Sequence, residues 1–205
     1  MQQLKQIALL CGFAALTACA GVGIVATDDP LAKLNDAEDL IMRQDRPLPA
    51  ERLIREAIAI YEERSDQHGL GNANREYGDL LRSHAILNWE TVYRRDGFQD
   101  TSITFENRFE KASEFYRKSI TYYERAEPLL QQAGKYDALT NVYFNAAWSH
   151  LQVGENEKAC GYYDKTTQAY DENKRRNPSA KPYIPSGSGS FAEFISATKR
   201  RAGCS

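Results

Sequence analysis

Few residues of this chain are of the types that carry catalytic or metal chemistry, and they lie far apart. The three histidines, His68, His84 and His150, are separated by long intervals, and no H-E-x-x-H zinc motif occurs. The sequence also has no G-x-x-x-x-G-K-[ST] or G-x-G-x-x-G phosphate loop and no G-x-S-x-G serine motif. It therefore predicts no catalytic residue, no metal site and no dissociable cofactor.

Charge and composition indicate a folded domain and argue against a nucleic-acid partner. The chain has 205 residues, of which 42% are hydrophobic, and 26 Lys and Arg oppose 28 Asp and Glu. This length and composition suffice for one domain with its own core. The charge balance does not favour nucleic acid as a partner. Carboxylates such as Glu62-Glu63 alternate with Lys and Arg in the manner of solvated helix faces.

The first 27 residues predict export from the cytoplasm. Lys5 is the only charge in residues 1–6, and an apolar or small-residue run follows from Ile7 to Ala18, as in a secretory signal. The run closes at Leu16-Thr17-Ala18-Cys19, which resembles the bacterial lipobox. That resemblance implies cleavage after residues 1–18, a diacylglycerol on the Cys19 sulfur and acylation of its freed amine.

The same resemblance suggests where the mature protein resides. Ala20 at the second mature position is similar to the signal for passage to the outer membrane. Residues 19–29 would then form a lipidated tether that holds the body at the outer membrane, facing the periplasm. Two alternatives remain: Ala18-Cys19-Ala20 fits ordinary secretion, and residues 7–26 are long enough to be an inner-membrane anchor.

The remaining cysteines predict a disulfide. Cys11 lies in the signal and Cys19 would carry lipid, so the mature body keeps Cys160 and Cys204. In an oxidising compartment such a pair forms a bridge, which would close a loop of about 44 residues. The alternative is a buried Cys160 with a free Cys204.

Apolar periodicity predicts helices almost throughout residues 30–173. Asp29 can cap a first helix that begins at Pro30, and Pro49 can begin a second that ends near Gln67-His68-Gly69. Further helices are expected over residues 72–94, 105–133, 136–153 and 155–174. The segment from Arg94 to Asp100 should be an exposed loop.

An Ala followed four residues later by a Tyr recurs in three of these helices, as Ala57/Tyr61, Ala112/Tyr116 and Ala159/Tyr163. With Tyr77-Gly78 and the turn residue Gly154, this pattern resembles the tetratricopeptide repeat. The spacings of 55 and 47 residues exceed the 34 of that family, so the helices should be longer or carry insertions. The resemblance implies an all-α, right-handed solenoid of antiparallel helix hairpins over residues 30–176. The alternative is an unrelated antiparallel bundle.

The C-terminal segment is predicted to cover the end of the solenoid. Residues 177–189 are rich in Pro, Gly and Ser and read as a linker. Ser190 and Glu193 form a capping box that begins a last helix within residues 190–205. This helix should fold back as a cap, although a basic, Phe-rich tail could instead bind a membrane or a partner.

The repeat alignment also predicts a partner-binding groove. The residues expected to face it are Asn72, Arg75, Asp79, Asn141, Asn145 and Trp148. The expected function is thus a non-catalytic, lipid-anchored adaptor that binds an envelope protein or peptide. The alternatives are an envelope enzyme that acts on peptidoglycan, which would need two close carboxylates in a deep pocket, and a self-associating spacer.

Overall fold

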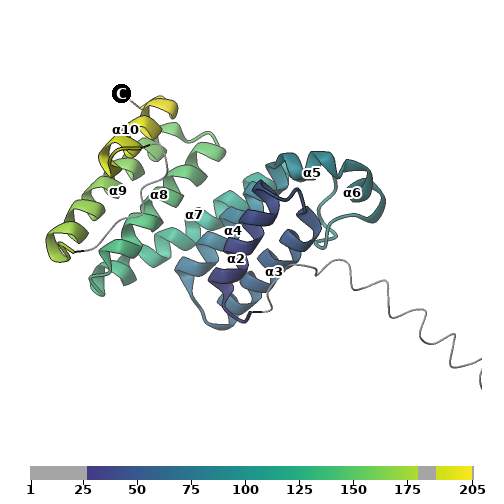
Figure 1. Cartoon of the computed structure of the whole chain (residues 1–205), viewed down its shortest axis with the longest axis horizontal. Helices are drawn as coiled ribbons and strands as arrows, with labels where there is room; N and C mark the ends of the chain where they lie inside the picture. The colour runs from purple at the N-terminus through teal and green to yellow at the C-terminus, as the bar shows by residue number, and fades with distance from the viewer. Residues whose placement is uncertain (1–26, 180–187, 205) are drawn as a thin grey trace, which may run out of the picture.

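The computed structural model describes residues 27–179 and 188–204, and these residues form nine helices and no strand (Figure 1). The all-α expectation is therefore confirmed. In chain order the helices are α2 (Pro30–Met42), α3 (Pro47–Glu63), α4 (Gln67–Arg82), α5 (His84–Asn88), α6 (Glu90–Asp96), α7 (Arg108–Gln132), α8 (Tyr136–Gln152), α9 (Asn156–Arg176) and α10 (Phe191–Arg201). Within these ranges no helix combines the length and apolar character needed to cross a membrane. The predicted signal, Cys19 and most of the tether lie outside the described residues, as does most of the linker.

The long helices pack in pairs. Helix α2 packs against α3, α4 against α7, and α8 against α9, while α3–α4 and α7–α8 contacts join successive pairs. The first helix of each pair also touches the next first helix, since α4 contacts both α2 and α8. Along the long axis, α5 and α6 lie toward one end, and α9 and α10 lie at the other (Figure 1).

The N-terminal helices begin where capping chemistry places them. The backbone N–H of Leu31 donates to Asp29 Oδ1 (2.9 Å), and Pro30 occupies the first position of α2, as predicted. Helix α3 begins at Pro47, so the prediction of a start at Pro49 was wrong by two residues. Both prolines fit in this first turn because its N–H groups have no partner within the helix.

The structure differs from the predicted second and third helices at both ends of each. Helix α3 ends at Glu63, and Asp66 caps a new helix by accepting from the N–H of Gly69 (3.0 Å), so His68 and Gly69 lie in the first turn of α4. The predicted helix over residues 72–94 is three helices. Ser83 ends α4 and caps α5 through the N–H of Ile86 (3.4 Å), and Trp89 separates α5 from α6.

The loop predicted between Arg94 and Asp100 begins later than expected, and it is exposed at many positions but buries three apolar side chains. Arg94 to Asp96 belong to α6, and the fourth helix begins at Arg108 instead of Phe105. Phe98, Ile103 and Phe105 are buried. The buried carboxylate of Glu51 on α3 positions this loop, because its Oε1 accepts from the N–H of Gln99 (2.8 Å) and from the Tyr77 hydroxyl (2.8 Å). Burial raises the pKa of Glu51.

The repeated Ala and Tyr positions lie at the contacts between helices. Ala57, Ala112 and Ala159 are fully buried, and the tyrosines that follow them are at most 6% exposed. Glycines of α4 make room for tyrosine rings of the neighbouring helices. A Cβ at Gly78 would lie 2.8 Å from the Tyr116 ring, and one at Gly71 would lie 2.4 Å from the Tyr123 ring.

The C-terminal helix packs against the last pair. Ser190 Oγ accepts from the N–H of Glu193 (3.2 Å), and α10 packs on α9. Phe191 and Ile195 join the hydrophobic cluster of Ala147 and Tyr163. Cys160 and Cys204 are joined in a disulfide, with their Cα atoms 5.6 Å apart. Gly154 forms the α8–α9 turn with a φ of +80°, a conformation that favours glycine.

We predict that Gly71→Ala lowers the free energy of unfolding by about 1–3 kcal/mol, because the buried Tyr123 ring cannot move away from the new methyl group. Gly161→Ala is the matched control: this helical glycine of α9 has open space around it, and the same change should stabilise by about 0.5–1 kcal/mol. Urea unfolding followed by circular dichroism measures both. Equal effects of the two substitutions would contradict the close α4–α7 contact.

Candidate functional site

Two adjoining clefts lie where α2, α4 and α8 meet. The first has a volume of about 400 Å³ and is lined by Leu34 of α2, His68 of α4 and residues of α8. The second, of about 660 Å³, is lined by Ile41, Met42 and residues of α4, α5 and α8. Glu38, Arg75 and Glu76 line both clefts, so the two clefts are next to each other. We refer to this combined hollow as the α2–α4–α8 cleft.

All six residues that the sequence assigned to a partner-binding groove line this cleft. They are Asn72, Arg75, Asp79, Asn141, Asn145 and Trp148. Five of them belong to two clusters of hydrogen bonds that cross from one helix to another. The sixth, Asn141, is exposed and makes no side-chain hydrogen bond with the described residues. Its amide is therefore free to bind another molecule.

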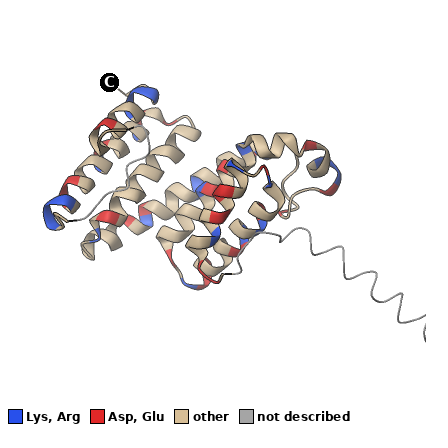
Figure 2. Ribbon diagram, viewed as in Figure 1, with Lys and Arg blue, Asp and Glu red and all other residues tan. Residues whose placement is uncertain are grey.

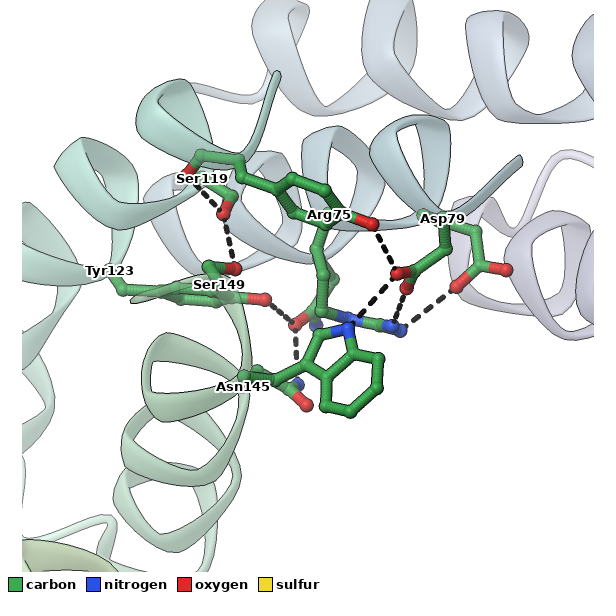
Figure 3. A network of polar contacts seen from close by, with 10 residues as sticks. Arg75, Asp79, Ser119, Tyr123, Asn145 and Ser149 are labelled. Atoms are coloured by element: carbon green, nitrogen blue, oxygen red, sulfur yellow. Dashed lines mark hydrogen bonds and ion pairs between the residues drawn. The ribbon is translucent and has the colours of Figure 1, made fainter. Parts of the chain in front are cut away.

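Asp79 is the centre of the first cluster. One of its oxygens accepts from the guanidinium of Arg75. The other accepts from the Tyr116 hydroxyl of α7 (2.7 Å) and from the Trp148 indole N–H of α8 (3.0 Å). Figure 3 shows Arg75 and Asp79 turned toward each other within this group. One carboxylate thus joins three helices.

Asn72 plays the same part in the second cluster. Its Oδ1 accepts from the Tyr123 hydroxyl (2.9 Å) and from the Asn145 side-chain amide (3.2 Å). Nearby, the buried hydroxyls of Ser119 and Ser149 bond to each other at 2.7 Å and join α7 to α8 (Figure 3). The walls of the cleft are therefore held by side chains that are already hydrogen-bonded before any ligand arrives.

Sequence reasoning missed Glu76, Tyr116 and Tyr123. A signal for the tyrosines existed: Asn72 and Asp79 are seven residues apart, and so are Tyr116 and Tyr123. Seven residues are about two helical turns, so each pair shares a face, and two antiparallel helices can match the pairs. Glu76 carries no such pattern, because an acidic residue next to an arginine is also typical of a solvated helix face.

Glu76 is an acidic residue of the cleft whose pKa is shifted from its ordinary value. Its side chain is only 7% exposed, and its Oε2 accepts from Arg75 at 2.9 Å. Burial raises the pKa of Glu76 to about 7; Arg75 opposes that shift, while Asp79 and Glu38 add to it. Burial alone would lower the pKa of Arg75, but Asp79 and Glu76 raise it, so the guanidinium stays charged.

The histidines do not form a site together. His68 and His84 line different parts of the cleft, and His150 is buried elsewhere, where its Nδ1 bonds to Glu155 at 2.7 Å. Burial lowers the pKa of both His68 and His150. Within residues 27–179 and 188–204, no three His, Cys, Asp or Glu are grouped so as to hold a metal ion.

The raised pKa of Glu76 predicts a pH-dependent stability. Between its ordinary value of 4.5 and about 7, the folded state binds more protons at this site than the unfolded state. Stability from this group is therefore lost as the pH rises through that interval. Urea unfolding from pH 5 to pH 8, at approximate steps of one unit, should show the wild type losing stability relative to Glu76→Gln. Glu62→Gln, at an exposed position of α3, is the control. A constant difference between wild type and Glu76→Gln would contradict the burial of an acid.

No protein-family model, no curated protein and no solved structure matches this chain. The function therefore has to be argued from the residues of the cleft and from the sequence signals around it.

Proposed function

We propose that this chain is a non-catalytic adaptor whose α2–α4–α8 cleft binds a segment of a partner polypeptide. The observation that carries the proposal is the pair of adjacent clefts, which the six expected residues line from α4 and α8. A cleft of this size between helices suits a short peptide or one face of a helix. The partner side chains would meet walls that are already ordered, which reduces the entropy cost of binding.

The fold we propose for this adaptor is a TPR-like, right-handed solenoid with α10 as its C-terminal cap. Three observations support it: the pairing of α2–α3, α4–α7 and α8–α9, the contacts among the first helices, and the buried Ala and Tyr of the second helices. In such a solenoid the first helices line the concave face. The cleft lies on these helices, α2, α4 and α8.

The different parts of the cleft offer complementary contacts. The exposed amide of Asn141 can donate and accept hydrogen bonds with an extended backbone. The second part offers apolar surface, since Met42 is 74% exposed and Trp148 is 38% exposed. Large apolar side chains that fill such a pocket are the usual source of affinity in protein recognition.

We further propose that the protein is anchored by lipid at Cys19 to the outer membrane and faces the periplasm, so that its partner is an envelope protein. The lipobox-like Leu16-Thr17-Ala18-Cys19 supports the anchor. The Cys160–Cys204 disulfide fits an oxidising compartment. A tether of about ten residues reaches at most ~35 Å, which keeps the cleft close to the membrane.

A second candidate function is an enzyme that acts on peptidoglycan. It is favoured by one observation, the pKa of about 7 of Glu76 in a cleft that also holds Asp79. We rank it second because Arg75 binds both carboxylates, and Asp79 also accepts from Tyr116 and Trp148. Asp79 thus has no oxygen free of a donor for an attack on a sugar. Release of soluble fragments from peptidoglycan by the wild type, lost in Glu76→Gln, would reverse this ranking.

Site-specific photocrosslinking tests the adaptor. A benzophenone amino acid at Asn141 or Met42, exposed positions in the two parts of the cleft, should crosslink to the same envelope protein in intact cells. The same residue at Phe109 or Leu129, which are exposed on α7 outside the cleft, should not. Equal capture from α7, or none from positions 42 and 141, would contradict binding in the cleft.

The anchor has its own test. The wild type grown with labelled palmitate should incorporate the label and sediment with outer membranes, and Cys19→Ala should do neither. Cys160→Ser/Cys204→Ser is the matched control, because it removes two other sulfurs and should keep the label. If Cys19→Ala stays in the membrane without label, residues 7–26 are the anchor instead.

A further inference from the structure

The guanidinium of Arg75 is already paired with two acidic side chains of its own chain. One terminal nitrogen bonds to Asp79 and the other to Glu76, and its Nε is buried without a partner. Asp79 in turn has both oxygens bonded (Figure 3). The charge of Arg75 is therefore already opposed by two acidic side chains, and a partner's carboxylate would meet an excess of negative charge there. This argues against an acidic ligand at the point where the two parts of the cleft meet.

Carboxylates are in excess at that point. Glu38 of α2 is exposed, lines both parts of the cleft and makes no hydrogen bond or ion pair with the described residues. Glu76 uses only Oε2, and its Oε1 accepts no hydrogen bond from the described residues. Three acidic side chains, those of Glu38, Glu76 and Asp79, thus line this part of the cleft with one guanidinium, which pairs only with Glu76 and Asp79. Glu76 is 7% exposed and, with its pKa raised to about 7, is about half ionised near neutral pH; a further cation beside it would stabilise the ionised form.

The other charged groups along the cleft do not supply that cation. Arg43 bonds to Asp39 at 3.0 Å, at the outer end of α2. Asp45 accepts from Asn88, and Asp66 caps α4 through Gly69. Arg82 is exposed in the second part of the cleft, near the end of α4. The excess negative charge at Glu38 and Glu76 is therefore local, since the chain as a whole is nearly neutral. Elsewhere on the described helices basic and acidic residues are interspersed (Figure 2).

We infer that the cleft binds a polypeptide segment that carries a Lys or Arg side chain, which enters between Glu38 and Glu76, next to a large apolar side chain. The apolar side chain packs on Ile41, Met42 and Trp148 in the second part of the cleft. The inference rests on the proposed adaptor function and specifies the chemistry of its partner. The cation pairs with both glutamates and leaves the Arg75–Asp79 pair intact.

The test selects peptides on the full-length protein in detergent from a library of random linear peptides. Three versions are compared: the wild type, Glu38→Gln/Glu76→Gln in the cleft, and Glu62→Gln/Glu63→Gln on the exposed face of α3, which removes the same charge elsewhere. Helical circular dichroism confirms that each variant is folded. Wild-type peptides should be enriched in a Lys or Arg beside a Leu, Phe or Trp. Their affinity should fall about tenfold for the cleft variant and stay unchanged for the α3 variant.

The other outcomes separate this inference from the function on which it rests. Peptides that crosslink at position 141 but carry no basic enrichment, or carry acidic residues, would overturn the inference and leave the adaptor standing. The same conclusion follows if the cleft variant and the α3 variant lose affinity equally. A library that yields no binding above background would overturn both, because a peptide-binding cleft would then be absent.

Discussion

The carboxylate of Asp79 is the contact on which the cleft depends. It accepts hydrogen bonds from Arg75 on its own helix, from Tyr116 on α7 and from Trp148 on α8. Without it, two buried or half-buried donors and a guanidinium would lose their acceptor at once, at a cost that exceeds the net worth of any one of these bonds. The relative positions of α4, α7 and α8, and with them the shape of the cleft, follow from this one group. Asn72 repeats the arrangement with Tyr123 and Asn145 two helical turns away.

Close packing between α4 and α7 is what allows this arrangement. Tyr116 and Tyr123 both belong to α7. Their hydroxyls donate to Asp79 and Asn72, two residues of α4 that line the cleft. Their rings pass α4 at Gly78 and Gly71, where a Cβ would lie within 3 Å of the ring. The glycines, the tyrosines and their acceptors are each separated by seven residues. The same seven-residue spacing therefore places the glycines at the α4–α7 contact and the acceptors Asn72 and Asp79 in the cleft.

The parts of this structure that were predictable from sequence are those that local chemistry decides. Asp29 and Ser190 cap their helices as expected, because a side-chain oxygen beside free N–H groups needs no tertiary partner. The break of the third helix at Ser83 was not predictable, since the apolar period continues across it. The 97–107 loop is held by a hydrogen bond to Glu51, which is distant in the chain and resembles a surface residue by type. Glu76 was missed for the same reason: only the packing of α2 and α8 around α4 reveals that its environment is poor in water.

The acidic side chain that costs the fold stability, Glu76, lies in the cleft. Glu76 is buried, incompletely paired and close to two other carboxylates, an arrangement that costs stability relative to a neutral side chain at the same position. Between the helices of a pair, by contrast, small and aromatic side chains pack closely, and α10 and the disulfide close the C-terminal end. The close packing away from the cleft offsets the stability that Glu76 costs. Near pH 7 Glu76 is about half ionised, and a positive ligand would favour its ionised form, which is the physical basis of the basic partner proposed above.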